Sequence, residues 1–329
     1  MNGASAQWPD AAGSTGRERL VNRRYTRDVS LEWRTVEIVD ADELADEPLG
    51  TKQKFWVTNP DDDRPWLFKF ARVREGRTLG EDWAEWLVHH LGERLGAPTA
   101  LIHPAVCDSR RGIVSRSVID SVAVERLVHG NSLLVEVDPS YDPIRGRNNP
   151  RYTVAAVQAA LDGVQAPLEF AGPSIMDGFD VWAGYLVLDA WVAGRDRHHE
   201  NWGVLSSQQG RTLAPSYDHG NALGFQERPE HILTLNADPQ QRARWLSRGR
   251  SHHFAGRPAL VDLAHEALQS ASEDARNFWK TQLSSLDSVA MSDIVRSVPR
   301  EIMSDPAHTF ALDILTGNRE RLLRDYPGR

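Results

Sequence analysis

The stretch GRDRHHENWGVL, residues 194–205, ends an apolar run, GFDVWAGYLVLDAWVAG, that begins at residue 178. Every position from 195 to 201 carries a charged, imidazole or amide side chain. The apolar run predicts a buried helix, so a polar segment of this density directly after it indicates a loop with a chemical task. Asp196 and Asn201, five positions apart, are its candidate functional residues.

A second polar block follows in PSYDHGNALG, residues 215–224, where Asp218 stands two positions before Gly220. Two carboxylates and an amide are hard oxygen ligands that suit Mg²⁺, which leaves room for phosphate oxygens. The order D-x-x-x-x-N followed by D-x-G is that of the catalytic loop and metal aspartate of protein kinases. Residues 201–205 and 211–218 read as the strands of one hairpin that would carry both metal ligands into a single cleft. Structural capping and turn formation by the same residues is the alternative.

A nucleotide site on this plan also requires a cation for phosphate, taken from a strand and paired with a helical glutamate. The segment WLFKF, residues 66–70, supplies Lys69 among apolar neighbours. Glu81 and Glu85 stand one helical turn apart in the predicted helix over residues 80–98, so either could reach Lys69. The alternatives are a strand-edge lysine whose ammonium reaches water and a glutamate on a solvated helix face.

The chain divides into a strand-rich part and a helix-rich part. Short alternating runs between residues 35 and 70, and again between 100 and 119, predict strands on either side of the helix just described. Beyond residue 125 the apolar patterns lengthen to helical periods. We therefore predict an α+β, two-lobed fold with a small β-rich N-lobe holding one main helix and a larger helical C-lobe. The predicted divisions are a mobile tail over residues 1–18, the N-lobe over 19–125 and the C-lobe over 126–329.

The two polar blocks together, GRDRHHENWGVL and LAPSYDHGNALG, resemble the HipA-like atypical serine/threonine kinases, whose protein-kinase-like fold is related to that of phosphatidylinositol kinases. The motif of that family is roughly N-x-D-x-H-x-x-N followed by L-x-P-x-Y/F-D. The resemblance implies that Asp196 is the catalytic aspartate, that Asn201 and Asp218 are Mg²⁺ ligands, and that Lys69 is the lysine that binds ATP.

The resemblance extends over residues 49 to about 325. The segment LGTKQKFWV, from residue 49, is similar to the short phosphate loop of the family, which implies that Gly50 and Thr51 bind the nucleotide through a turn with exposed backbone N–H groups. The helical glutamate of the family is matched better by Glu85 than by Glu81. The segment FALDILTGNRERLL, near the end of the chain, resembles the last helix of the family.

Two departures from the family pattern are visible. Gly194 stands where the family usually has Asn, which removes no metal ligand. Toxin members of the family commonly carry an extra amino-terminal subdomain before the phosphate loop, and only residues 1–48 precede that loop here. We therefore expect this chain to lack the subdomain, and the resemblance leaves a toxin role and an antitoxin partner open.

Composition narrows the function classes further. The formal net charge of −8 argues against direct binding to nucleic acid. The single cysteine, Cys107, is expected to be a core residue and excludes an internal disulfide or a multi-cysteine zinc site. Adjacent His198 and His199, without a second spaced pair, fit a tetrahedral zinc site poorly, so His198 is expected to fix its loop. No leader-like segment or long apolar run is present, which favours a cytoplasmic protein without membrane contact.

The sequence thus predicts an enzyme, an ATP- and Mg²⁺-dependent phosphotransferase, with the resemblance implying a protein substrate that carries a serine or threonine acceptor. Neither G-x-x-x-x-G-K-[ST] nor G-x-G-x-x-G occurs in the chain, so the common P-loop and dinucleotide motifs do not compete. The alternatives are a small-molecule or lipid kinase on the same scaffold and a nucleotide-binding pseudokinase module.

Overall fold

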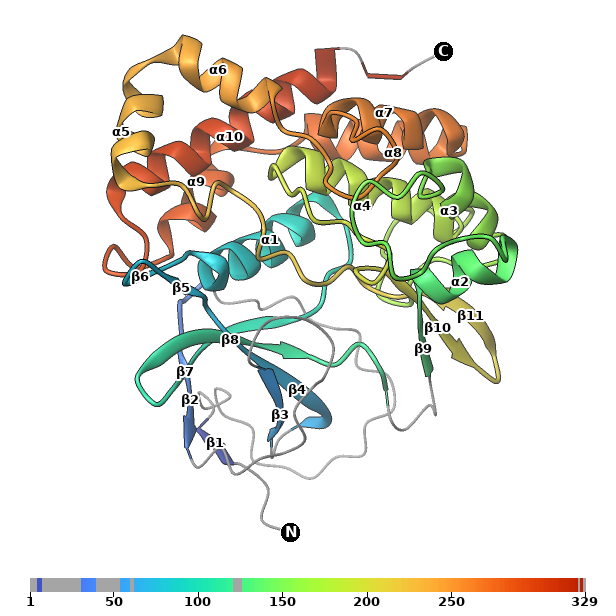
Figure 1. The fold of residues 1–329 in the computed structure, drawn as a ribbon, viewed down its shortest axis with the longest axis horizontal. Helices are drawn as coiled ribbons and strands as arrows, with labels where there is room; N and C mark the ends of the chain where they lie inside the picture. The colour runs from blue at the N-terminus through green and yellow to red at the C-terminus, as the bar shows by residue number, and fades with distance from the viewer. Residues whose placement is uncertain are drawn as a thin grey trace.

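The N-lobe is built on one six-stranded sheet (Figure 1). The computed structural model describes residues 5–7, 31–39, 54–59, 62–120, 126–324 and 326–327. In spatial order the strands of this sheet are β1 (Ser5–Gln7), β2 (Val36–Val39), β7 (Ile102–Cys107), β8 (Arg110–Arg116), β4 (Asp62–Phe70) and β3 (Lys54–Asn59). Neighbouring strands are antiparallel except for β2 and β7, which are parallel. Strand β4 therefore has a hydrogen-bonded neighbour on each side.

Strand β4 alternates its side chains between two cores. Phe68 is fully buried in a small core on one face of the sheet, together with Val57 and Val114. Lys69 points to the opposite face, because successive side chains of a strand alternate. Its partner in the register with β8 is Ile113, which packs in the main core of the protein. The sheet thus presents the ammonium group of Lys69 toward the rest of the molecule.

Helix α1 (Glu81–Leu95) lies between the sheet and the C-lobe, and nearly all of its residues are buried (Figure 1). It contacts β7 and β8 as well as α8 (Glu273–Ser284) and α9 (Ser288–Arg296). The predicted helix is confirmed, and it ends at Gly96, which adopts the left-handed conformation. Its polar positions are nevertheless buried as well, because C-lobe helices cover the side away from the sheet.

Besides the six-stranded sheet, the N-lobe contains a short hairpin of β5 (Val73–Arg74) and β6 (Arg77–Thr78), which precedes α1.

The C-lobe combines a small sheet with a group of helices (Figure 1). The C-lobe sheet has the order β11 (Gly210–Leu213), β10 (Gly203–Ser207) and β9 (Arg126–His129). The remaining helices are α2 (Gly130–Val137), α3 (Val154–Ala160), α4 (Gly178–Trp191), α5 (Pro229–Ala237), α6 (Pro239–Ser247), α7 (Leu260–Ser270) and α10 (Asp305–Arg324).

Helix α4 forms the centre of the C-lobe, and every one of its residues is buried. Apart from Asp180 and Asp189 its residues are apolar on all sides, as the sequence pattern predicts for a helix surrounded by others. Asp177 caps its first turn by accepting a hydrogen bond from the backbone N–H of Asp180. Near its last turn, the indole N–H of Trp191 donates to the carbonyl oxygen of Leu315 on α10. The chain therefore leaves α4 from a fixed point in the interior and enters the polar segment 194–201.

The two-lobed α+β fold expected from the sequence is confirmed. One difference concerns residues 1–18, expected to be a tail outside the fold, because Ser5–Gln7 pairs with β2 as strand β1. The predicted lobe boundary at residue 125 falls within residues 121–125, outside the described part of the chain. Cys107 is a buried free thiol, as expected. Across the described residues, no helix has both the length and the apolar character needed to span a bilayer.

Candidate functional site

Lys69 joins three separate elements at the interface between the lobes. Its ammonium nitrogen lies 3.4 Å from Glu85 Oε1 on α1 and 3.1 Å from Asp218 Oδ1 in the loop after β11. Burial lowers the pKa of Lys69, but the charges of Asp218 and Glu85 outweigh burial and hold this pKa above its ordinary value. The lysine is therefore a charged group that is only 13% exposed, and it keeps two carboxylates as counter-ions.

Glu85 binds both lobes through its two oxygens. While Oε1 faces Lys69, Oε2 accepts a hydrogen bond of 2.9 Å from the backbone N–H of His219. Glu81, one turn earlier, instead accepts from the backbone N–H and the guanidinium of Arg72. The structure therefore places Glu85, and not Glu81, beside the lysine, which matches the choice made from the sequence.

A buried ion pair fixes the position of the loop after α4. Two guanidinium nitrogens of Arg197 each lie 2.8 Å from an oxygen of Asp189 on α4. A third nitrogen of Arg197 donates to the carbonyl oxygen of Asn201, and the amide group of Asn201 donates to the carbonyl oxygen of Asp196. A bidentate guanidinium–carboxylate pair fixes geometry as well as charge. Asp189 is thus the buried anchor of the loop that carries Asp196 and Asn201.

Asp196 receives a partner from a distant segment. Nε2 of His253, in the segment before α7, lies 2.6 Å from Asp196 Oδ1. The other ring nitrogen of His253 forms a hydrogen bond with the carbonyl oxygen of Gly146. Burial raises the pKa of Asp196, but the hydrogen bond and charge of His253 outweigh it, so the pKa of this carboxyl lies below its ordinary value. Asp196 is therefore an ionised carboxylate at neutral pH.

Asp196, Asn201 and Asp218 line one small pocket together with Asp189 and His219. Asp218 adopts a left-handed backbone conformation with φ of 62°. That conformation costs a residue other than glycine on the order of 1–2 kcal/mol, and the contacts of Asp218 with Lys69 and of the next residue with Glu85 oppose this cost. Two carboxylates and one amide facing one space are a donor set that fits Mg²⁺.

The remaining sequence candidates have different outcomes. Gly50 and Thr51, the expected phosphate-loop residues, lie outside the described residues. His198 accepts a hydrogen bond on Nδ1 from the backbone N–H of Glu200, in agreement with its expected role in fixing the loop. His199 is buried, and its Nδ1 lies 2.6 Å from the hydroxyl of Tyr141.

His253 and His219 are residues that sequence reasoning missed. His253 is 57 residues from Asp196, so no local spacing could associate the two. His219 follows Asp218 directly, and its backbone, rather than its ring, carries the contact with Glu85. Burial strongly lowers the pKa of the His219 ring, which is therefore neutral. Only the adjacency of His219 to Asp218 was available in the sequence.

Comparisons with known proteins agree with this geometry at the level of the fold. No model of a known protein family and no curated protein matches the chain. Among solved structures, the proinflammatory kinase CtkA of Helicobacter pylori is similar with a TM-score of 0.64 and 15% identity, covering 84% of this chain and 90% of CtkA. The chain therefore has a protein-kinase-like fold, as the resemblance to HipA-like kinases implies.

A second similarity concerns HipA of Shewanella oneidensis MR-1, solved as a complex with HipB and operator DNA. It has a TM-score of 0.42 and 11% identity, and it covers 86% of this chain and 66% of the HipA chain. At this score the similarity is weak, so the assignment of the fold rests on CtkA.

Proposed function

We propose that this protein is an ATP- and Mg²⁺-dependent kinase, and more specifically a HipA-like kinase that phosphorylates serine or threonine on a protein. One observation carries the proposal. Lys69 pairs with both Glu85 and Asp218, while Asp218 shares a pocket with Asp196 and Asn201. A cation beside a set of oxygen ligands is the arrangement that phosphoryl transfer requires, since that chemistry depends on positioning and on neutralising charge.

The residues present fit the nucleotide and its metal. Asn201 and Asp218 would hold Mg²⁺, and Lys69 would bind the α- and β-phosphates, with Glu85 fixing the position of the lysine. When bound, Mg²⁺-ATP supplies the transferable phosphoryl group and the positive charge that offsets its oxygens. Lys69 is charged before any nucleotide arrives, so the site requires no proton uptake at this residue.

Asp196 would orient the acceptor hydroxyl and accept its proton. Its Oδ1 is paired with His253, and among the described residues no hydrogen bond is made to Oδ2. The lowered pKa keeps the group ionised, which a proton acceptor requires. The ion pair with Asp189 fixes Arg197, and Arg197 donates to the carbonyl oxygen of Asn201. The side-chain amide of Asn201 in turn donates to the carbonyl oxygen of Asp196, so the backbone of Asp196 is held in place. These contacts support a preformed position for the acceptor.

The test is incubation of the purified protein with ATP labelled at the γ-phosphate, with Mg²⁺ and a cell lysate, beside the Asp196→Asn variant. We expect label on protein serine or threonine with the wild type and at most a trace with the variant. Label on a lipid or metabolite would identify the small-molecule or lipid kinase instead. Nucleotide binding without any transfer would identify a pseudokinase, and absence of both binding and transfer would contradict the proposal.

A further inference from the structure

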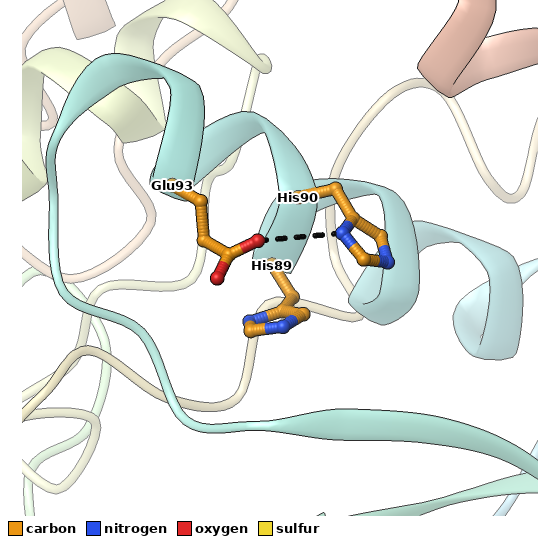
Figure 2. Close-up of side chains that lie close together, drawn as sticks. All are labelled: His89, His90 and Glu93. Carbon is orange, nitrogen blue, oxygen red and sulfur yellow. Dashed lines mark ion pairs between the residues drawn. The ribbon is translucent and has the colours of Figure 1, made fainter. Parts of the chain in front are cut away.

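A group of side chains of the kinds that bind metals lies on the C-terminal half of α1, and none of its members lines the pocket of Asp196. His89, His90 and Glu93 gather there, and their nearest ligand atoms all lie within 4.8 Å of one another. Figure 2 shows the carboxylate of Glu93 turned toward the two imidazole rings. Glu93 is four residues after His89 and three after His90, and both spacings place side chains on one helix face. The helix therefore presents three ligands at once.

His89 has an unused nitrogen in the protein interior. The hydroxyl of Thr99 donates to the carbonyl oxygen of His89, so the Thr99 oxygen is oriented to accept from His89 Nδ1 at 2.9 Å. A proton on Nδ1 leaves a lone pair on Nε2. That nitrogen is buried and has no hydrogen-bond partner in the part of the chain that the structure describes. Burial lowers the pKa of His89 to about 3, so the ring is neutral, the form in which imidazole binds metals.

The other two ligands are held in compatible positions. His90 Nδ1 lies 3.4 Å from Glu93 Oε2. Two bonds of about 2.0–2.1 Å at a tetrahedral angle separate their ligand atoms by about 3.4 Å, so this pair already has the spacing that zinc requires. The ring of Trp86 packs edge-on against His90 at a centroid distance of 4.2 Å, which fixes the orientation of that imidazole. The side chain of Glu93 is 31% exposed and gives an ion access from solvent.

We propose that His89, His90 and Glu93 form a Zn²⁺ site whose fourth position is taken by solvent. Two imidazole nitrogens and one carboxylate oxygen are a ligand set of zinc. Thr99 is then the outer partner that fixes the tautomer of the ligand His89, an arrangement common around protein metals. Binding would bring the ligand atom of His89 closer to those of His90 and Glu93 by moving the His89 ring toward them. Because Glu85 lies on the same helix, the ion would also stiffen the element that presents Glu85 to Lys69.

The test is zinc content and affinity of the full chain, measured by mass spectrometry of bound metal and by competition with a chromophoric chelator. After metal removal and reloading, we expect one equivalent of Zn²⁺ on the wild type. Thr99→Val removes an outer partner of a ligand and should lower the zinc affinity about 10- to 100-fold. Glu93→Gln removes a ligand itself and should lower the zinc affinity at least about 10-fold. Replacement of zinc by Co²⁺ should give the visible absorption of a four-coordinate ion.

Two control variants separate this site from other histidine–carboxylate groups. His231 and Glu227 form a pair at the i,i+4 spacing with a contact of 2.6 Å, and in the part of the chain that the structure describes they belong to no group of three ligands, so His231→Gln should leave the zinc affinity unchanged. His252→Gln removes one member of the other candidate group, Asp196, His252 and His253, and should also leave it unchanged. Circular dichroism of the metal-free variants checks that they fold.

Three results would overturn the proposal. The first is a wild type that retains no Zn²⁺ through dialysis. The second is zinc binding that survives Glu93→Gln and is lost in His252→Gln. The third concerns Thr99→Val, which keeps all three ligands and decides the question if Glu93→Gln does not fold. A zinc affinity of Thr99→Val equal to that of the wild type would contradict the site.

Discussion

His253 Nε2 lies 2.6 Å from Asp196 Oδ1, and this contact connects the segment before α7 to the loop after α4. Its ring also binds the carbonyl oxygen of Gly146, so a third segment of the C-lobe fixes the imidazole. Since the hydrogen bond to His253 opposes the effect of burial on Asp196, a residue remote in sequence contributes to the lowered pKa of the proposed proton acceptor.

Replacement of Asp196 by Asn should lower turnover at least about 100-fold while ATP affinity stays close to that of the wild type, because a general base contributes about 10²- to 10⁴-fold and does not bind the nucleotide. Steady-state phosphorylation rates and calorimetric titration with ATP measure the two effects separately. Turnover that is unchanged in this variant would remove Asp196 from the chemistry.

Replacement of His253 by Gln should move the acidic limb of the rate profile to higher pH. In the wild type the folded-state pKa of Asp196 lies below its ordinary value. The stability that the carboxylate contributes is therefore fully present at pH values above the ordinary aspartate pKa, and it is lost as the pH falls through the lower folded-state pKa. Without His253, burial is the largest remaining influence and raises this pKa. The pH dependence of kcat/KM for both proteins, with His231→Gln as control, measures the shift. An acidic limb at the same pH in both proteins would show that His253 does not set the charge of Asp196.

Glu85→Gln and Glu81→Gln form a matched pair on one helix. Glu85 contacts Lys69, whereas Glu81 contacts Arg72. Loss of one charged hydrogen bond typically changes a free energy by about 1.5–3 kcal/mol, roughly 10- to 150-fold in an equilibrium constant. We expect a loss of that size in kcat/KM for Glu85→Gln and a loss of stability with little change in kcat/KM for Glu81→Gln. Equal kinetic effects of the two substitutions would contradict the proposed role of Glu85.

Removal of the guanidinium in Arg197→Met should destabilise the protein by about 3–5 kcal/mol, because it leaves the buried carboxylate of Asp189 without a counter-ion. Urea denaturation followed by tryptophan fluorescence measures this change. The double variant Arg197→Met with Asp189→Leu should recover part of the loss, since both buried charges are then absent. A single variant as stable as the wild type would mean that the ion pair does not anchor the loop.

The sequence predicted the part of the site that depends on local spacing. Asp196, Asn201 and Asp218 follow from two short blocks joined by a hairpin, and β10 and β11 form that hairpin. Lys69 followed from an apolar strand, because alternation directs it to one face of the sheet. Its burial against Glu85 required the helix-rich lobe to cover α1, which no pattern within α1 could indicate.

Contacts between distant segments could not be predicted in the same way. His253 reaches Asp196 only because the chain folds back after α6, and the sequence around it shows no periodic signal. Which of Glu81 and Glu85 contacts Lys69 also depends on Arg72, because its backbone N–H and its guanidinium donate hydrogen bonds to the carboxylate of Glu81. The resemblance to the kinase family favoured Glu85, whereas helical spacing alone left both glutamates possible.

Calorimetric titration with ATP, in the presence and absence of Mg²⁺, tests most directly whether Lys69, Asn201 and Asp218 form one nucleotide site. We expect the wild type to bind ATP more tightly when Mg²⁺ is present, Asp218→Asn to lose this increase, and Lys69→Met to bind ATP more weakly under both conditions. ATP affinity that is independent of Mg²⁺ in the wild type, or unaltered in both variants, would contradict it.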